Sequence, residues 1–226
     1  MFLTNFDFAR CEINILKHTM RNTILSGLTL LILCSNIYGQ TKDLNIDFML
    51  RGSIYAGSNI LDTLALGGFG SSENLPQKMN DSLKFPEQGL FLKIDNSNIV
   101  TFIDQYNGYT LYLGNNSDTI VNLSASDSRL YVIAEVFYRG KWRPIEYLPS
   151  SFCGNSYHKV YLNPNEYWAF EIPKFSGKKK VNLRYSLLVG KNEYIYSNKI
   201  PSSINKKQLT KIKQYNPKGI MDPYSN

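Results

Sequence analysis

Residues 181–187 read VNLRYSL, and they show most directly how this chain folds. The apolar positions are Val181, Leu183, Tyr185 and Leu187, and the residues between them are polar. Because successive side chains of a β-strand point to opposite faces, this alternation places the four apolar side chains on one face. The stretch therefore predicts a β-strand with one face in the core and the other in water.

The same period of two recurs on both sides of this stretch. Residues 90–94 (LFLKI) and 167–172 (YWAFEI) alternate in the same way, whereas residues 130–138 (LYVIAEVFY) are apolar on both faces except at Glu135 and predict a central strand. Turn residues interrupt the pattern about every ten residues, which is typical of a sandwich or barrel and predicts roughly nine or ten strands after residue 89. We therefore predict an all-β fold, an immunoglobulin-like antiparallel β-sandwich.

Three segments of different character make up the mature part of the chain. Residues 40–88 are rich in glycine and serine, which predicts an irregular N-terminal β segment with long loops. Residues 89–204 carry the regular alternation and predict the β-sandwich domain. Residues 205–226 predict a short helix, because Leu209 and Ile212 are three positions apart, followed by a basic C-terminal tail.

The first residues have the pattern of an export signal. Lys17 and Arg21 precede the apolar run 24–34, and Gly39 offers a small residue at the exit, so residues 1–39 predict a cleaved signal peptide. Met20 offers an alternative start of translation. The apolar run is shorter than the ~20 residues of a membrane-spanning helix, so no transmembrane span is expected in the mature chain. The chain is expected to be exported, and to be periplasmic, outer-membrane-associated or extracellular.

The cysteines add two expectations. Lipid attachment to Cys34 requires small residues before it, and the bulky Leu33 argues against a lipoprotein. After cleavage only Cys153 remains, so no internal disulfide can form and stability must come from the hydrophobic core.

The positive charge is concentrated near the C-terminus. From Lys174 onward the chain has eleven lysines and one arginine against Glu193 and Asp222. Such an end can meet acidic lipid, an anionic glycan or an acidic protein, or it can simply be a solvated face and tail. Nucleic acid is not an expected partner of an exported protein.

Few residues suggest catalysis. Cys153 and His158 could form a thiolate–imidazole pair, which keeps a hydrolase as one alternative. One cysteine and one histidine cannot supply the three or four ligands of a zinc site, and the motifs for phosphate or dinucleotide binding are absent. We expect no cofactor, metal or catalytic residue.

Strand carboxylates offer another catalytic possibility. A glycosidase needs two facing carboxyl groups. Four glutamates lie in predicted strands, and each is expected by default to face solvent: Glu135, Glu146, Glu166 and Glu171.

Aromatic residues suggest binding instead. Rings of Tyr and Trp can stack on sugars or anchor a protein partner, although many such rings simply pack in a core. Trp142, Tyr147 and Trp168 are the candidate ligand or partner surface. The function expected is a non-enzymatic binding or assembly module of the cell envelope, whose partner is a protein or a glycan. A carbohydrate-binding module that uses exposed Tyr and Trp is the first alternative.

Several short motifs give the chain a family resemblance. They lie at residues 111–118, 140–146, 162–166, 177–184 and 196–208. In these stretches the chain resembles exported immunoglobulin-like β-sandwich proteins of Gram-negative, Bacteroidetes-type bacteria. The resemblance covers less than half of the chain, and it implies a fold but no activity.

Overall fold

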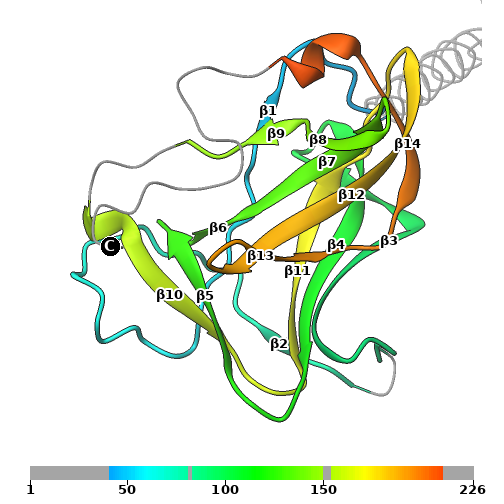
Figure 1. Ribbon diagram of the computed structural model, residues 1–226. Helices are drawn as coiled ribbons and strands as arrows, with labels where there is room; N and C mark the ends of the chain where they lie inside the picture. Colours follow the sequence, from blue (N-terminus) through cyan, green and yellow to red (C-terminus); the bar gives the residue numbers. More distant parts are fainter. Residues whose placement is uncertain (1–40, 81–82, 150–153, 211–226) are drawn as a thin grey trace, which may run out of the picture. The chain divides into compact units, whose positions relative to one another are not determined.

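The computed structural model describes residues 41–80, 83–149 and 154–210, which belong to one unit that begins at Thr41 (Figure 1). The predicted signal peptide 1–39, Cys34, Cys153 and the tail from residue 211 lie outside the described residues.

Strands are the main regular secondary structure of the described chain. The strands before the predicted sandwich are β1 (Leu50–Arg51) and β2 (Gln77–Lys78). The later strands are β3 (Gly89–Phe102), β4 (Tyr106–Asn116), β5 (Val121–Ser126), β6 (Arg129–Leu130), β7 (Val132–Tyr138), β8 (Lys141–Pro144), β9 (Glu146–Tyr147), β10 (Tyr157–Leu162), β11 (Glu166–Pro173), β12 (Lys179–Gly190), β13 (Glu193–Tyr196) and β14 (Ile200–Ile204). Two short 3₁₀-helices complete the set, η1 (Gly154–Ser156) and η2 (Lys206–Leu209).

The prediction of nine or ten strands after residue 89 was too low, because the residues described from Gly89 to Thr210 already form twelve, β3 to β14. Two long extended runs are each divided by a single irregular residue. Tyr131 separates β6 from β7, and Ile145 separates β8 from β9. An alternating pattern does not reveal such breaks, because they alter backbone hydrogen bonding rather than side-chain polarity.

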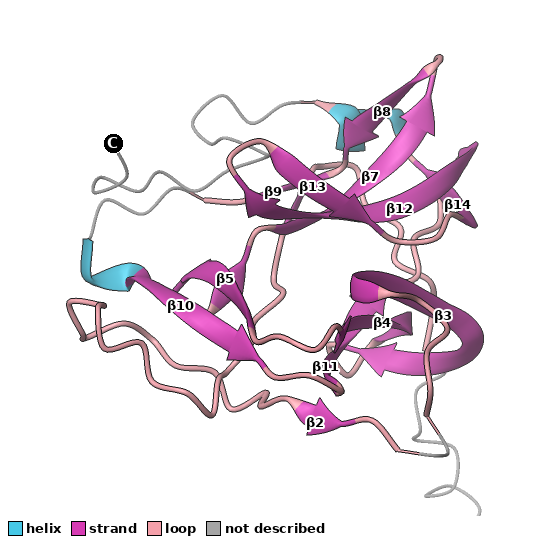
Figure 2. Cartoon of the chain, turned by 60° about the horizontal axis from the view of Figure 1, so that its bottom comes forward, coloured by secondary structure: helices cyan, strands magenta, loops and turns pink. Residues whose placement is uncertain are grey.

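Two antiparallel sheets face each other and confirm the predicted β-sandwich. One sheet has the order β2-β11-β4-β3, and the other has the order β13-β12-β7-β8 with β14 also paired to β12. Figure 2 shows these sheets as separate layers. A smaller sheet, β10-β5-β6, and the parallel pair β1-β9 extend the structure. The immunoglobulin-like assignment within this fold class stays a prediction.

The core lies between the two large sheets, as the alternation predicts. Leu183, Tyr185 and Leu187 of β12 are each 2% exposed or less. They join the same apolar cluster as Leu111 and Leu113 of β4. Strand β7 pairs with β12 on one side and β8 on the other, which confirms the central position predicted for residues 130–138.

The segment before β3 is irregular but closely packed. The Trp168 indole Nε1 donates a hydrogen bond to the Gly57 carbonyl at 3.0 Å, which ties this segment to β11. The Ser58 hydroxyl accepts from the Tyr161 amide at 3.1 Å, and the Asp62 carboxylate accepts from the Lys159 amide at 2.7 Å. Side chains thus satisfy backbone donors along β10, where a neighbouring strand would otherwise be needed.

Candidate functional site

The predicted site residue Trp142 belongs to a row of stacked side chains. The Arg184 guanidinium lies 4.1 Å from the centroid of the Trp142 ring and 3.7 Å from that of Tyr196. Trp142 also packs against Phe137, with centroids 5.5 Å apart, and Tyr196 stacks on Tyr194, with centroids 6.4 Å apart. These five residues, from β7, β8, β12 and β13, are called the aromatic ladder below.

Strand register explains why the ladder forms. Phe137 lies directly opposite Trp142, and Tyr196 lies opposite Ser186, two residues from Arg184. Side chains opposite one another, or two residues apart, share a face of the sheet. The ladder therefore lies on the face of this sheet that points away from the core.

A buried carboxylate forms an ion pair with the arginine of the ladder. Glu135 lies opposite Arg184, and its Oε2 accepts hydrogen bonds from Nε at 3.2 Å and Nη2 at 3.0 Å. The two side chains are only 5% and 15% exposed. A guanidinium between two aromatic rings gains cation–π attraction on both faces, while the carboxylate balances its charge. The rings of Trp142 and Tyr196 are thus kept in defined positions.

The edges of the ladder are open, and a lysine lies beside them. Phe137 is 44% exposed and Tyr196 is 47% exposed. The Lys199 ammonium lies 5.9 Å from the Trp142 ring centroid. The surface therefore combines exposed aromatic rings with basic side chains.

Of the three aromatic residues predicted for the site, only Trp142 lies in the ladder. Trp168 is fully buried, so its assignment to a ligand or partner surface is wrong. It lies on the core face of β11, and its polar nitrogen is already bonded to the Gly57 carbonyl. Tyr147 is half-buried on β9, where it pairs with Arg51.

Sequence reasoning missed the other four residues of the ladder: Phe137, Arg184, Tyr194 and Tyr196. The alternation in residues 181–187 already places Arg184 on the outer face of a strand. What brings Arg184 to Trp142 is the pairing of β12 with β7 and of β7 with β8. Strand order and register of this kind cannot be obtained from one strand's sequence.

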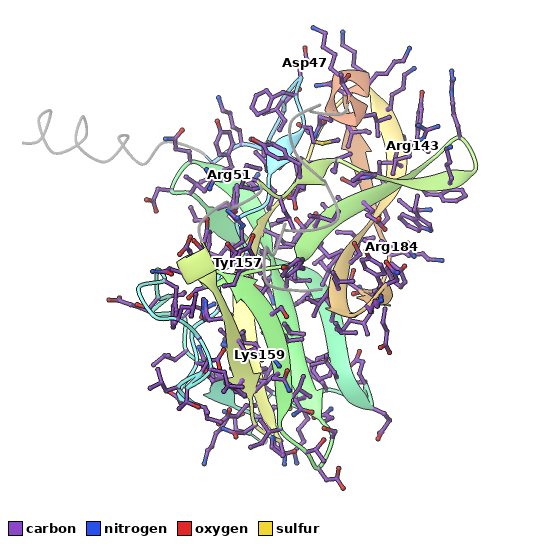
Figure 3. The ribbon with its side chains drawn as sticks, turned by 60° about the vertical axis from the view of Figure 1, so that its left-hand side comes forward. Asp47, Arg51, Arg143, Tyr157, Lys159 and Arg184 are labelled. Atoms are coloured by element: carbon purple, nitrogen blue, oxygen red, sulfur yellow. The ribbon has the colours of Figure 1, made fainter. Side chains whose placement is uncertain are left out.

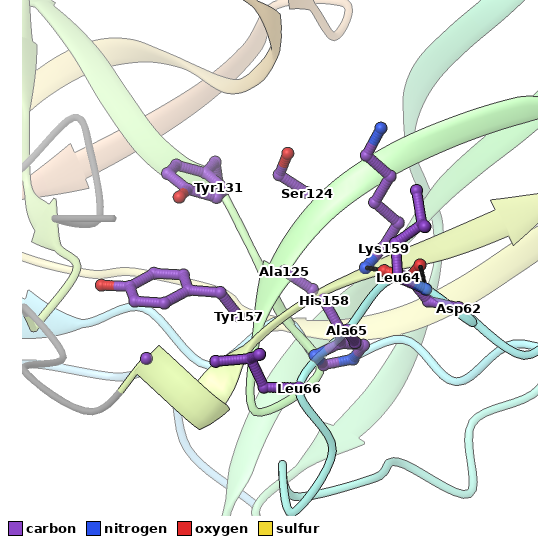
Figure 4. A pocket seen from close by; sticks show the side chains of 11 residues that line it. Asp62, Leu64, Ala65, Leu66, Ser124, Ala125, Tyr131, Tyr157, His158 and Lys159 are labelled. Atoms are coloured by element: carbon purple, nitrogen blue, oxygen red, sulfur yellow. Dashed lines mark hydrogen bonds between the residues drawn. The ribbon is translucent and has the colours of Figure 1, made fainter. Parts of the chain in front are cut away.

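A second candidate site is a pocket of about 410 Å³ beside β5 and β10 (Figure 4). Its lining comes from these strands, from the irregular segment and from Tyr131 between β6 and β7; it includes Leu64, Leu66, Ala125, Tyr157 and Lys159. This volume falls within the range of about 300–1,000 Å³ typical of small-molecule sites.

His158 lies beneath this pocket in a closed setting. Its ring stacks on Phe69 with a centroid distance of 3.8 Å and an interplanar angle of 7°. Nδ1 lies 3.3 Å from the Ser156 carbonyl oxygen, and Nε2 lies 3.4 Å from the Ser128 hydroxyl. Burial lowers the pKa of His158 and favours its neutral form. Its predicted partner Cys153 lies outside the described residues, so the pairing stays a prediction.

Three of the four strand glutamates do not face solvent, which contradicts the default expectation. Glu135 pairs with Arg184, and Glu166 accepts hydrogen bonds from the backbone and side-chain amides of Asn163. Only Glu171 is exposed. Charged residues enter strand interiors where a partner compensates for the lost solvation, and such partners are not visible in an alternating pattern.

Glu146 is the most deeply buried of these carboxyl groups. Oε2 accepts from the Ala134 amide at 2.9 Å, and the Tyr185 hydroxyl lies 3.4 Å from Oε1. Burial raises the pKa of Glu146 to about 7, although both hydrogen bonds oppose the rise. The same burial raises the pKa of Tyr185.

The described residues form neither a metal-binding group nor a membrane-spanning helix. Within 41–80, 83–149 and 154–210, no group of three His, Cys, Asp or Glu side chains is placed to hold a metal ion. No helix in the described part of the chain has the length and apolar character to cross a membrane.

Comparisons with known proteins do not extend these observations. No protein-family model, no curated protein and no solved structure matches this chain. The resemblance to exported immunoglobulin-like sandwich proteins therefore stays a prediction.

Proposed function

We propose that the chain, after export, is a non-enzymatic binding or assembly module of the cell envelope that contacts an acidic protein partner through the aromatic ladder. The observation that carries this proposal is the fixed position of Arg184 between Trp142 and Tyr196. Trp, Tyr and Arg are the residue types that dominate binding energy at protein interfaces.

Pre-organisation supports the same conclusion. A surface whose side chains are already ordered loses little conformational entropy when a partner binds. Here the Glu135 ion pair and the stacked rings order the side chains before binding. Lys199, which lies beside the ladder, would complement an acidic side chain on a partner and would increase the rate of association.

An anionic glycan is the second candidate ligand for this surface. The exposed rings of Phe137 and Tyr196 could stack on sugar rings while nearby lysines meet acidic groups. A glycan would bind without any protein present, which separates the two candidates.

Capture from the native cell envelope tests the proposal. The immobilised protein should retain a specific protein, and Trp142→Ala and Tyr196→Ala should each weaken that retention at least tenfold if these rings are hot spots. Phe48→Ala is the matched control, because Phe48 is 58% exposed but lies outside the ladder. If this chain alone is retained on an acidic polysaccharide, and the same two variants lose that retention, the ligand of the ladder is a glycan and not a protein. Equal capture by all variants would refute the role of the ladder.

The remaining alternative and the export prediction have separate tests. Rapid labelling of Cys153 by a thiol reagent at neutral pH would support a lowered thiol pKa and the hydrolase alternative. Mass spectrometry of the protein from its native cells should find a chain that begins at or near Gln40.

A further inference from the structure

The pocket beside β5 and β10 offers an apolar interior at one side of the molecule. Figure 4 shows the rings of Tyr131 and Tyr157 on one side of the pocket and Leu64 with the Lys159 side chain on the other. Ala125 and Leu66 contribute further apolar surface. In Figure 3 the β10 residues Tyr157 and Lys159 lie well apart from Arg184, so the pocket is distinct from the aromatic ladder.

Three exposed leucines lie on the loop beside the pocket, and two of them, Leu64 and Leu66, line it. Leu61 is 74% exposed, Leu64 is 88% exposed and Leu66 is 64% exposed, all within six residues. Single exposed apolar residues are common, but a cluster of this kind beside a pocket marks a binding surface. These side chains would lose contact with water if an apolar ligand covered them.

The loop that carries the leucines is anchored at both ends. At its start, Ser58 and Asp62 accept hydrogen bonds from the backbone of β10. At its end, the Gly70 amide donates to the Asp127 carboxylate at 2.9 Å, and the Ser128 hydroxyl donates to the Gly70 carbonyl at 2.9 Å. The leucines are therefore presented by an anchored segment, which lowers the entropy cost of binding.

The exposed charge at the pocket is the Lys159 ammonium, whereas the negatively charged Asp62 is buried. Asp62 also lines the pocket, but its carboxylate already accepts from the amides of Lys159 and Leu64, and the residue is only 8% exposed. Lys159 is exposed and forms no ion pair with any residue that the structure describes. Ser124 lies directly opposite Lys159 in the strand pairing and adds an exposed hydroxyl group.

We propose that this pocket binds a single-chain amphiphilic carboxylate, of the fatty-acid class. The acyl chain would lie against the leucines, Ala125 and the two tyrosine rings, and the carboxylate would meet the Lys159 ammonium and the Ser124 hydroxyl. An apolar wall with one exposed cation at its edge complements an apolar chain with one negative charge. The proposal concerns a site separate from the aromatic ladder and does not depend on the partner of that ladder.

Binding of laurate to the full-length protein tests the proposal. A fluorescent polyene fatty acid serves as the probe, and laurate below its micelle concentration should displace it from one saturable site. Dodecylamine and methyl laurate have the same chain but a positive or no charge. Each should bind more weakly than laurate, by about two- to fivefold, which is the range expected for an exposed ion pair.

Two pairs of variants locate the site. Lys159→Met removes the charge but keeps the apolar stem, and should remove most of the preference for laurate over methyl laurate. Lys141→Met is its control, because Lys141 is exposed on β8. Leu64→Ser combined with Leu66→Ser should weaken all three ligands, whereas Leu75→Ser should weaken none, since Leu75 is 46% exposed but does not line the pocket.

Several results would overturn the proposal. They are the absence of saturable laurate binding, equal affinity for dodecylamine, and laurate binding that neither the Lys159 nor the leucine variants change. Binding only to phosphatidylglycerol vesicles, without displacement of the probe by laurate, would also overturn it, because the leucines would then serve membrane contact.

Discussion

The side-chain amide of Asn198 pairs with both backbone polar groups of Ile94. Nδ2 donates to the Ile94 carbonyl at 3.0 Å, and Oδ1 accepts from the Ile94 amide at 2.7 Å. Ile94 lies on the edge strand β3, and Asn198 lies between β13 and β14 of the opposite sheet. One side chain therefore joins the two layers of the sandwich and satisfies an edge position that would otherwise be open to another strand.

Replacement of Asn198 should destabilise the sandwich. Asn198→Asp keeps an acceptor for the Ile94 amide but places a second acceptor against the Ile94 carbonyl, and we expect a loss of about 1–3 kcal/mol in the free energy of unfolding. Urea unfolding measures the change. Asn96→Ala is the control, because Asn96 is exposed on β3, the strand of Ile94. Its free energy of unfolding should stay within about 0.5 kcal/mol of that of the unsubstituted protein. Equal stability of Asn198→Asp and the unsubstituted protein would show that the pairing contributes nothing.

Glu146→Gln should stabilise the protein at neutral pH but not in acid. The folded-state pKa of Glu146 is about 7, against an ordinary value of 4.5. As pH rises from 4.5 to 7, the unfolded chain loses the Glu146 proton while the folded chain keeps it, so this group lowers stability over that window. Glutamine does not titrate. The variant should match the unsubstituted protein near pH 4 and exceed it by an amount on the order of 3 kcal/mol above pH 7.5.

Urea midpoints at a series of pH values check this prediction, and the difference between the two proteins removes the contribution of all other groups. A difference that does not change with pH would mean that the Glu146 carboxyl titrates alike in the folded and unfolded chains.

Arg184→Ala should disorder the aromatic ladder. The substitution removes the cation between Trp142 and Tyr196 and leaves the Glu135 carboxylate buried without its partner. Removal of one partner of a buried ion pair costs about 3–5 kcal/mol, and the partial exposure of Arg184 places the expected loss near the lower end of that range. Because the chain has only two tryptophans and Trp168 is fully buried, a red shift in fluorescence would report Trp142.

Arg139→Ala provides the comparison for this experiment. Arg139 lies over the Tyr138 ring in the turn after β7, outside the ladder. The Arg139→Ala substitution should leave both the fluorescence maximum and the unfolding midpoint almost unchanged. An unshifted spectrum in Arg184→Ala would indicate that Trp142 keeps its position without the arginine.

His158→Phe should make the protein less sensitive to acid. Burial lowers the pKa of His158 in the folded chain, so below the ordinary value of 6.5 the unfolded chain binds a proton that the folded chain does not. His158 therefore makes its full contribution to the free energy of unfolding above pH 6.5. That contribution declines as the pH falls toward the lowered pKa. Phenylalanine keeps the stack on Phe69 but does not titrate. NMR titration of the His158 ring protons should show a midpoint below 6.5, and a midpoint above it would contradict the prediction.

The regular strands were predictable because their signal is local. The alternation in residues 181–187 depends only on neighbouring residues, and β12 buries the three side chains Leu183, Tyr185 and Leu187 as expected. The central position of residues 130–138 was likewise readable from apolar character on both faces, and β7 has a strand on each side. These features determined the all-β fold class and the antiparallel sandwich.

The candidate sites depend on contacts between residues far apart in the sequence. Arg184 meets Trp142 only because β7 lies between their strands in a particular register. Trp168 cannot contact a partner at the surface, because its ring is buried and its nitrogen is bonded to the Gly57 carbonyl. The leucine loop lies beside Lys159 only because Ser58 and Asp62 bond to β10. The sequence alone thus determined which stretches form strands, since side-chain polarity along one strand reports its burial. The tertiary structure decided which side chains meet, because strand order, register and loop anchoring arise from the cooperative packing of the whole chain.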